Sequence, residues 1–262
     1  MFPNILGLLC AALALVGFTL AHRRAQNWPR AQIWRWLAVG TLASLPALYN
    51  ASHYLHVIPE AAWFYEVRSW RGTELLVISV GPTAGLLAAL LPRRLLLIPL
   101  LACVGVTWGP FLKPVLGPIK HAALRDVWIK DVCIQSTFST CGPASTATIL
   151  RTYGQRHTEE EIARVSHSYI GGTEAWYLAR YIRAQGLRAR FSLREEGFPT
   201  EVHAPAILGV TLEGRGHFIP LLARDGDAYL IGDPMNGPER LTRAQLDTRY
   251  GFTGFALEIL PE

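Results

Sequence analysis

The first 119 residues of this 262-residue chain contain very few acidic side chains. They hold three acidic residues against nine Lys and Arg, a net charge of +6, whereas the rest of the chain holds 17 acidic and 16 basic residues. The excess positive charge is therefore confined to the hydrophobic part, where it indicates the flanks of membrane segments. Runs of basic residues with interleaved aromatic side chains are also missing from residues 120–262, which argues against nucleic acid as a partner.

The chain is equally poor in metal-binding patterns. It has four cysteines, of which Cys10 and Cys103 lie inside apolar stretches, and four ligands at the spacing of a zinc site are absent. His53 and His56 precede Glu60 in a segment rich in Trp and Tyr. A metal site is one interpretation of this segment, but we favour an aromatic belt at a membrane edge. We expect no metal and no other cofactor.

Long uncharged runs predict an all-α transmembrane region. Apolar stretches occupy residues 4–21, 36–50, 74–92 and 95–111. The first is free of charge, and a helix of about 18 residues rises about 27 Å, close to the thickness of a hydrocarbon core. A cleaved signal peptide is the alternative, but the stretch lacks a basic start and is followed by others. We predict a transmembrane domain of about four helices over residues 1–119 and a second domain over residues 120–262.

The positions of Lys and Arg predict the orientation in the membrane. Six arginines lie between the first two stretches or between the last two: Arg23, Arg24, Arg30, Arg35, Arg93 and Arg94. The middle loop has only Arg68 and Arg71, diluted by three glutamates. Because positively charged loops stay in the cytosol, the N-terminus and the second domain are predicted to lie outside it, in a multi-pass protein of the bacterial inner membrane. The stretch at 36–50, which contains Pro46, is the weakest, and without it one end would change sides.

After residue 127 the pattern predicts helices followed by strands. Helices are expected at 140–154, from 158 onward behind a capping box, at 171–186 and at 241–250. Strands are expected at 187–193, 205–212, 217–224, 228–233 and 254–260. This order predicts an α+β fold in which a helical lobe packs on an antiparallel sheet.

The segment IQSTFSTCGPASTA places Cys141 at the start of a predicted helix. The positive end of a helix dipole lowers the pKa of a thiol and so favours the nucleophilic thiolate. Gly142 lets a substrate backbone approach closely, and Pro143 suits the first helical turn. Attack on a carbonyl carbon creates an oxyanion, which the backbone N–H of Cys141 and the side-chain amide of Gln135 can stabilise.

A base and its orienting group are available on two consecutive predicted strands. His217 begins one strand and Asp233 ends the next, and the turn at 224–227 can bring these ends together. The imidazole would take the thiol proton and later protonate the leaving amine, while the aspartate holds its other nitrogen. Taken singly, these residues fit a packing cysteine, a strand-edge histidine and a turn aspartate, but their order behind Gln135 favours a catalytic site. Gly142 and Gly216, beside the nucleophile and the base, are expected to contact substrate.

Four segments of this region resemble the papain-like cysteine peptidases that process bacteriocin leader peptides, the double-glycine peptidase family. The resemblance covers residues 126–260 and rests on QSTFSTCGPASTATIL, GGTEAWYLARYIRAQGLRARF, PAILGVTLEGRGHFIPLL and YLIGDPMNG. It implies a papain-like fold with a catalytic set that consists of Cys141 as nucleophile, His217 as base, Asp233 as orienting acid and Gln135 as oxyanion-hole donor. It also implies that Gly172 and Thr173 lie near the bound peptide.

The resemblance has two departures. The best-known members are N-terminal domains of ABC exporters, whereas this chain has the domain after its apolar stretches and no Gly-x-x-x-x-Gly-Lys-Ser/Thr loop. We therefore predict a membrane-anchored cysteine peptidase that hydrolyses an exported or membrane-associated peptide or protein through a triad and a thioester. The alternatives are an amidase or transpeptidase with the same triad, or a catalytically silent peptide-binding component of a secretion or signalling complex.

Cys133 lies eight positions before Cys141. We expect it to be a buried apolar residue. The alternative is a disulfide between the two cysteines, which an oxidising compartment could form and which would silence the enzyme.

Overall fold

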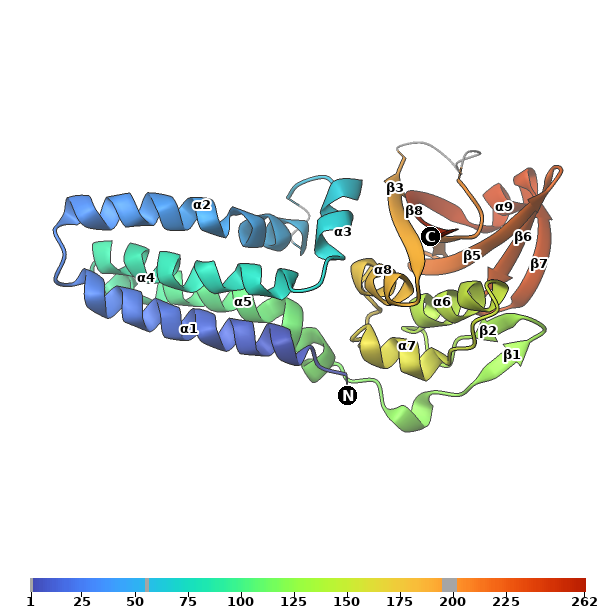
Figure 1. The fold of residues 1–262 in the computed structure, drawn as a ribbon, viewed down its shortest axis with the longest axis horizontal. Helices are drawn as coiled ribbons and strands as arrows, with labels where there is room; N and C mark the ends of the chain where they lie inside the picture. Colours follow the sequence, from blue (N-terminus) through green and yellow to red (C-terminus); the bar gives the residue numbers. More distant parts are fainter. Residues whose placement is uncertain (1, 55–56, 195–201) are drawn as a thin grey trace. The chain divides into compact units, whose positions relative to one another are not determined.

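The computed structural model describes residues 2–54, 57–194 and 202–262 (Figure 1). The chain divides into two compact units. We call Pro3–Glu60 with Arg71–Leu116 the helical unit, and Phe2 with Ala61–Trp70 and Gly117–Glu262 the sheet unit.

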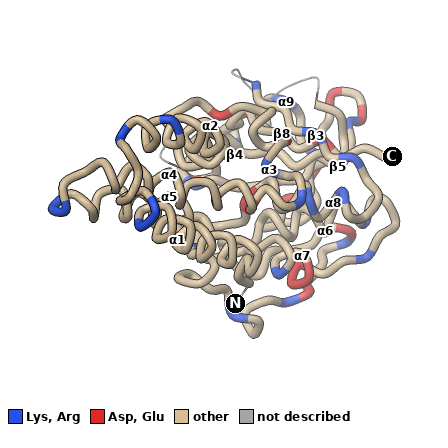
Figure 2. Tube along the Cα trace, turned by 60° about the vertical axis from the view of Figure 1, so that its left-hand side comes forward, with Lys and Arg blue, Asp and Glu red and all other residues tan. Residues whose placement is uncertain are grey.

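The helical unit is built from long helices and two short 3-10 helices. These are α1 (Ile5–Ala25), α2 (Arg30–Tyr54), η1 (Thr73–Ser79), α4 (Val80–Leu90), η2 (Arg93–Leu95) and α5 (Leu97–Leu116). Glycines let α4 approach α1 closely, because a Cβ on Gly81 would lie 1.8 Å from the carbonyl oxygen of Ala14. Lys and Arg gather at one end of these helices (Figure 2), where α1 ends and α2 begins and where α4 meets α5.

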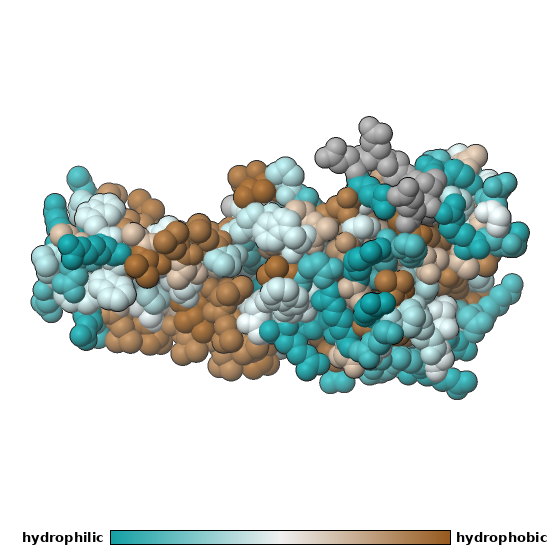
Figure 3. Space-filling view, turned by 45° about the horizontal axis from the view of Figure 1, so that its top comes forward, coloured by the Kyte–Doolittle hydropathy of each residue, from teal (hydrophilic) through white to brown (hydrophobic). Residues whose placement is uncertain are grey.

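Three helical segments within the described ranges are long and apolar enough to cross a membrane: Ile5–Ala25, Thr73–Leu90 and Arg93–Leu116. They contain three of the four predicted stretches. The fourth lies in α2, whose 25 residues include charged and polar positions that lower its hydropathy. Large apolar side chains point outward from α1, α2 and α5, and Figure 3 shows them as broad hydrophobic areas on this unit.

The two histidines of the middle loop can be placed only in part. His56 lies outside the described residues. Within the part of the chain that the structure describes, no group of three or more His, Cys, Asp or Glu side chains could hold a metal ion.

The sheet unit contains a six-stranded antiparallel sheet of order β3-β8-β4-β5-β6-β7 and a two-stranded ribbon, β1-β2. The strands are β1 (Val127–Ile129), β2 (Val132–Ile134), β3 (Leu187–Leu193), β4 (Ala206–Leu212), β5 (Arg215–Asp225), β6 (Ala228–Asp233), β7 (Gly237–Thr242) and β8 (Gly251–Pro261). The helices are α3 (Ala62–Arg68), η3 (His121–Ala123), α6 (Cys141–Thr152), α7 (Glu159–Val165), α8 (Ala175–Ala184) and α9 (Arg243–Arg249). The predicted combination of a helical lobe and an antiparallel sheet is confirmed.

Helices α6 and α8 pack together, with α6 against β5 and α8 against β3. The sequence of α6 explains its central place, since Ala, Ser, Thr, Ile and Leu cover its surface and every residue from Cys141 to Leu150 is buried. A separate core cluster on β4, β5 and β6 includes Leu208, Ile219 and Ile231, together with Leu246 of α9.

A short segment from between the apolar stretches belongs to the sheet unit. In α3, Phe64 and Tyr65 are buried, and the ring of Tyr65 lies 5.3 Å from that of Phe191 in β3 and 5.4 Å from that of Phe255 in β8. Aromatic burial of this kind is a large stabilising contribution. The sheet unit thus includes the ten residues Ala61–Trp70, which lie between the predicted apolar stretches.

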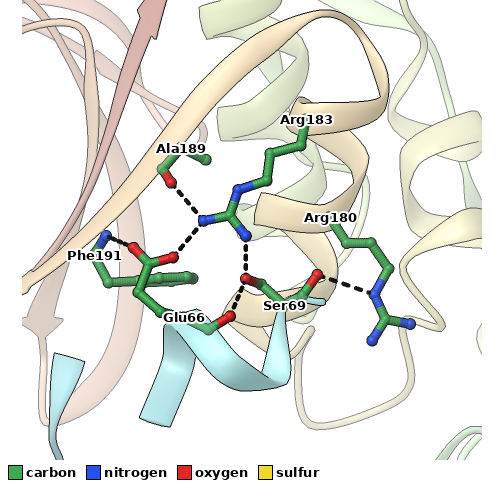
Figure 4. A network of polar contacts seen from close by, with 6 residues as sticks. All are labelled: Glu66, Ser69, Arg180, Arg183, Ala189 and Phe191. Atoms are coloured by element: carbon green, nitrogen blue, oxygen red, sulfur yellow. Dashed lines mark hydrogen bonds and ion pairs between the residues drawn. The ribbon is translucent and has the colours of Figure 1, made fainter. Parts of the chain in front are cut away.

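Polar contacts complete this attachment (Figure 4). Glu66 accepts a hydrogen bond from the backbone N–H of Phe191, at 2.9 Å, and pairs with Arg183. Arg183 also donates to the hydroxyl of Ser69 and to the carbonyl oxygen of Ala189, at 2.6 Å. Because β3 is an edge strand of the sheet, α3 covers backbone groups that would otherwise be open to pairing.

Candidate active site

Cys141 is the first residue of α6 and is 8% exposed. The next position is tightly enclosed, because a Cβ on Gly142 would lie 2.9 Å from Leu178, 3.4 Å from Phe218 and 3.6 Å from Thr173. Any larger residue at 142 would therefore require the side chain of Leu178 to move. The thiol sits where the free N–H groups of the first helical turn provide positive charge.

His217 and Asp233 come from adjacent antiparallel strands. The strands β5 and β6 are paired, with Leu221 opposite Ile231, and the turn between them returns the end of β6 to the start of β5. Nε2 of His217 lies 3.0 Å from Oδ1 of Asp233, and both side chains are buried. Because the two strands are consecutive and antiparallel, the two side chains are in direct contact.

The imidazole ring links this aspartate to the thiol. His217 is hydrogen-bonded to Asp233 through Nε2 and to the side chain of Cys141, for which Nδ1 remains. Burial opposes the charged ring, but the hydrogen bonds and charges of Asp233 and Cys141 raise the pKa of His217 to about 9. The ring is therefore held as an imidazolium beside the sulfur at neutral pH.

Asp233 is held by more partners than the sequence indicated. Oδ1 also accepts the backbone N–H of Met235, at 2.8 Å, while Oδ2 accepts Asn236 Nδ2 at 2.7 Å and the hydroxyl of Tyr250 at 2.8 Å. Burial opposes ionisation, but the hydrogen bonds from His217, Met235, Asn236 and Tyr250 lower the pKa of Asp233 to about 2. The turn sequence after Asp233 is a signal for Met235 and Asn236, whereas no local pattern points to Tyr250, which follows α9.

Gln135 follows β2 and lies beside the loop after Asp233. Its backbone N–H donates to the carbonyl oxygen of Pro234 at 2.9 Å. Its side-chain Oε1 is buried and has no hydrogen-bond partner among the described residues. The backbone contact places Gln135 beside the residue that follows Asp233, and the role of its side-chain amide stays a prediction.

The loop that carries Gly172 and Thr173 borders the start of α6. The backbone N–H of Gly171 donates to the hydroxyl of Ser139, at 3.1 Å, and Thr173 lies against the position that a Cβ on Gly142 would occupy. Gly172 has φ = +130°, a conformation that favours glycine.

The remaining predicted residue, Gly216, precedes His217 on β5 and is exposed, with open space where a Cβ would stand. Gly142, in contrast, is fully enclosed, as described above. Contact of these glycines with a peptide stays a prediction.

Cys133 takes no part in this arrangement. All four cysteines are free, and Cys133 is fully buried in β2, where its backbone N–H donates to Thr148 Oγ1 at 2.9 Å. Burial, followed by the charge of Glu159, raises the pKa of the Cys133 thiol. The thiol is therefore neutral and inert, which fits a packing residue, and the alternative disulfide to Cys141 is not formed.

Comparison of the sequence with known proteins identifies a family. The sequence model described as "Peptidase C39 family" matches residues 130–262. The chain belongs to the peptidase C39 family. This membership makes it a cysteine peptidase.

Two curated relatives of this C39 peptidase are named "Probable functional amyloid protease FapD". The protein from Pseudomonas aeruginosa is 27% identical over 151 residues, which cover 53% of this chain and 64% of that protein. The protein from Pseudomonas fluorescens is 27% identical over 185 residues, which cover 65% of this chain and 80% of that protein. The chain thus matches less than two thirds of the length of the first relative.

Solved structures with a similar fold include two peptidase domains. The peptidase domain of Streptococcus ComA, a bifunctional ABC transporter, is 19% identical, with a TM-score of 0.42 over 50% of this chain and 98% of that domain. A double glycine motif protease from an AMS/PCAT transporter, solved in complex with the leader peptide, is 24% identical, with a TM-score of 0.44 over 56% of this chain and 99% of that one.

In chemical terms, the C39 domain brings a thiol, a cationic imidazole and a buried carboxylate into one hydrogen-bonded row. Such a row can take a proton from the thiol and return it to a leaving group. A carbonyl carbon bound at the start of α6 would meet the sulfur there, with backbone N–H groups close by.

Proposed function

We propose that this C39 peptidase cleaves a peptide bond of an exported or membrane-associated protein, with Cys141 as nucleophile, His217 as acid and base, and Asp233 as orienting group. The observation that carries the proposal is the row of hydrogen bonds from Cys141 through His217 to Asp233. A buried packing cysteine has no need of an imidazolium, and a strand-edge histidine has no need of a carboxylate with four donors.

The reaction follows from these positions. The thiolate of Cys141 attacks the carbonyl carbon, and the oxyanion receives hydrogen bonds from the Cys141 backbone N–H and the Gln135 side-chain amide. His217 gives its proton to the leaving amine, which leaves a thioester on Cys141. His217 then accepts a proton from water, which attacks the thioester and releases the new carboxyl terminus.

Connectivity supports a location outside the cytosol. Phe2 packs on His121 and Ile119 within the sheet unit, and Ala61–Trp70 belongs to the same unit. Segments that fold together lie on one side of a membrane, so the chain between them must cross an even number of times. If α1 crosses, α2 must return, although its hydropathy is lower.

This arrangement has four crossings, with the arginine-rich turns together on the opposite side. The bias of Lys and Arg toward the cytosol then puts the sheet unit outside, at the bacterial inner membrane. An active phosphatase reporter fused after Glu262 is expected in intact cells, and an inactive one would reverse the orientation.

The substrate class follows from this location and from the relatives. A peptidase site outside the cytosol meets only exported or membrane-bound chains, and the two relatives are named as proteases of functional amyloid. We extend that class to this chain, so that a secreted component of an amyloid system is the first candidate. Tethering to the membrane would raise the local concentration of a substrate held at the same surface.

The test compares protein termini in the secreted and membrane fractions of wild-type and Cys141→Ala cells. We expect one or a few exported proteins to remain uncleaved in Cys141→Ala cells and to be cleaved normally in Cys133→Ala cells. Identical termini in all three strains would exclude the proposal. Cleavage in ¹⁸O-water distinguishes hydrolysis, which places ¹⁸O in the new carboxyl terminus, from transfer to an amine.

A further inference from the structure

Glu159 is a buried carboxylate that the reaction above does not use. It is 1% exposed and begins α7, after the N-cap residue Thr158. Its Oε1 accepts the backbone N–H of Ser136 at 2.8 Å, and its Oε2 accepts the hydroxyl of the same residue at 2.5 Å. A carboxylate buried for packing alone would cost free energy, so its hydrogen bonds indicate a specific task.

The contacts of Glu159 fall on the loop between the two expected oxyanion donors. Ser136 directly follows Gln135, and Thr140 directly precedes Cys141. The same loop is closed internally, because Thr140 Oγ1 lies 3.0 Å from the carbonyl oxygen of Thr137 and 3.1 Å from its N–H. The carboxylate therefore holds the end of the loop that follows Gln135.

We propose that Glu159 is a positioning residue of the oxyanion hole, which holds Gln135 in place through two hydrogen bonds to Ser136. The proposal rests on the proposed function, in which the side-chain amide of Gln135 helps to stabilise the oxyanion. Glu159 contacts no reacting atom and acts through Ser136.

Removal of the carboxylate would release this loop. The N–H of Ser136 would lose its acceptor in a buried place, and the loop would shift to find another. Loss of one oxyanion-hole donor slows acyl transfer by about 10²–10³-fold, so displacement of Gln135 is expected to have an effect of this size. Alkylation of a thiolate creates no oxyanion and is not expected to change.

Two probes of Cys141 separate these effects in the purified full-length protein. Acylation by the p-nitrophenyl ester of N-acetylglycine passes through an oxyanion, whereas alkylation by iodoacetamide does not. We expect Glu159→Ala to slow acylation about 100-fold, and alkylation by less than about threefold. Equal slowing of both reactions would show general damage and overturn the proposal.

Matched variants sharpen the test. Glu160→Ala removes the next carboxylate, which is half exposed and bonded to His121, and is expected to leave both rates unchanged. Glu159→Gln keeps an acceptor for the Ser136 N–H, and the Ser136 hydroxyl can turn to the carbonyl oxygen of Arg125, at 3.0 Å. This variant is expected to acylate within about fivefold of wild type.

A double variant and an exchange measurement complete the design. If Glu159 acts through Gln135, the variant with both changed to Ala acylates no more slowly than Gln135→Ala alone, whereas multiplied effects would contradict the proposal. Amide exchange in residues 135–140 is expected to accelerate in Glu159→Ala, and unchanged exchange would also overturn it. Exchange needs no turnover, so an inactive wild type would contradict the proposed function alone.

Discussion

Leucine occupies opposite environments in the two units. In the helical unit Leu13, Leu42 and Leu101 are between 53% and 68% exposed, whereas in the sheet unit Leu208 and Leu257 are completely buried. The same side chain is stabilised in both places only if the two units have different solvents. The outer surface of the helical unit is therefore apolar enough to lie in hydrocarbon, as the proposed membrane location requires, whereas the sheet unit buries its leucines in a core of its own.

The boundary between these environments does not follow the order of the chain. The segment Ala61–Trp70 lies between two stretches of the helical unit, yet its aromatic and acidic side chains fold into the sheet unit. The chain thus passes from the helical unit to the sheet unit and back before residue 72. The following predictions test whether a substitution in one unit leaves the activity and stability of the other unit unchanged.

The largest expected effect concerns the site in the sheet unit. We expect His217→Ala to lower the rate of peptide cleavage by about 10³-fold or more, because the thiol loses its proton acceptor. Thr107→Ala, which removes a buried hydroxyl bonded to Cys103 in the helical unit, is expected to leave the rate unchanged. Cleavage kinetics of the two purified full-length variants provide the measurement. Comparable losses would show that the two units are not functionally separate.

Much of the sheet could be predicted from its residue pattern. The five predicted strands correspond to β3, β4, β5, β6 and β8, because each is a short apolar or alternating run between turn residues. Strand β7 was missed because GPERLT begins with Gly-Pro and is mostly polar, as suits the last strand of a sheet. The short ribbon β1-β2 was missed because three residues are too few for a periodic signal.

The site was predictable where sequence order fixes neighbours. His217 and Asp233 lie on strands joined by one turn, so their approach follows from the turn alone. Tyr250, which follows α9, contacts Asp233, and Glu159 of α7 contacts Ser136. The attachment of α3 depends on a partner more than 100 positions away. Periodicity shows which face of a segment is apolar, but it does not show what that face packs against.

The second prediction concerns α3. Tyr65→Ala removes a buried ring between β3 and β8 and is expected to destabilise the sheet unit by about 3 kcal/mol. Trp63→Ala, which removes a side chain that is 56% exposed on the same helix, is the matched control and is expected to have a small effect. Amide exchange in Leu187–Leu193 of the full-length protein is the measurement. Equal exchange in both variants would show that α3 does not support β3.

The third prediction concerns the helical unit. Gly81→Ala places a Cβ against the backbone of Ala14 and is expected to destabilise the packing of α1 on α4 by about 1–3 kcal/mol. Gly105→Ala on α5 meets no atom within 4 Å and is expected to be neutral or slightly stabilising. Thermal unfolding in detergent compares the two variants. Rates of Cys141 alkylation should be equal in both, and a slower rate in Gly81→Ala would show that the units are coupled.

The smallest expected effect concerns His217: above its pKa, the cleavage rate is expected to fall by about tenfold for each pH unit. Because its pKa is raised to about 9 from an ordinary value near 6.5, its contribution to stability is complete below 6.5 and is lost as the pH rises through about 9. The cleavage rate depends on the same imidazolium and is expected to fall above pH 9.

The contribution of Asp233 has the opposite sign. Its pKa is lowered to about 2, so its stabilisation is lost only as the pH falls through that value. Asp233→Asn removes a charge that holds the proton on His217, and the loss of activity should then begin at a lower pH than in wild type. A pH profile of cleavage from 5 to 10.5 in wild type and in Asp233→Asn measures the shift of the alkaline decline. If the cleavage rate of Asp233→Asn declines at the same pH as that of wild type, the imidazolium does not depend on this carboxylate.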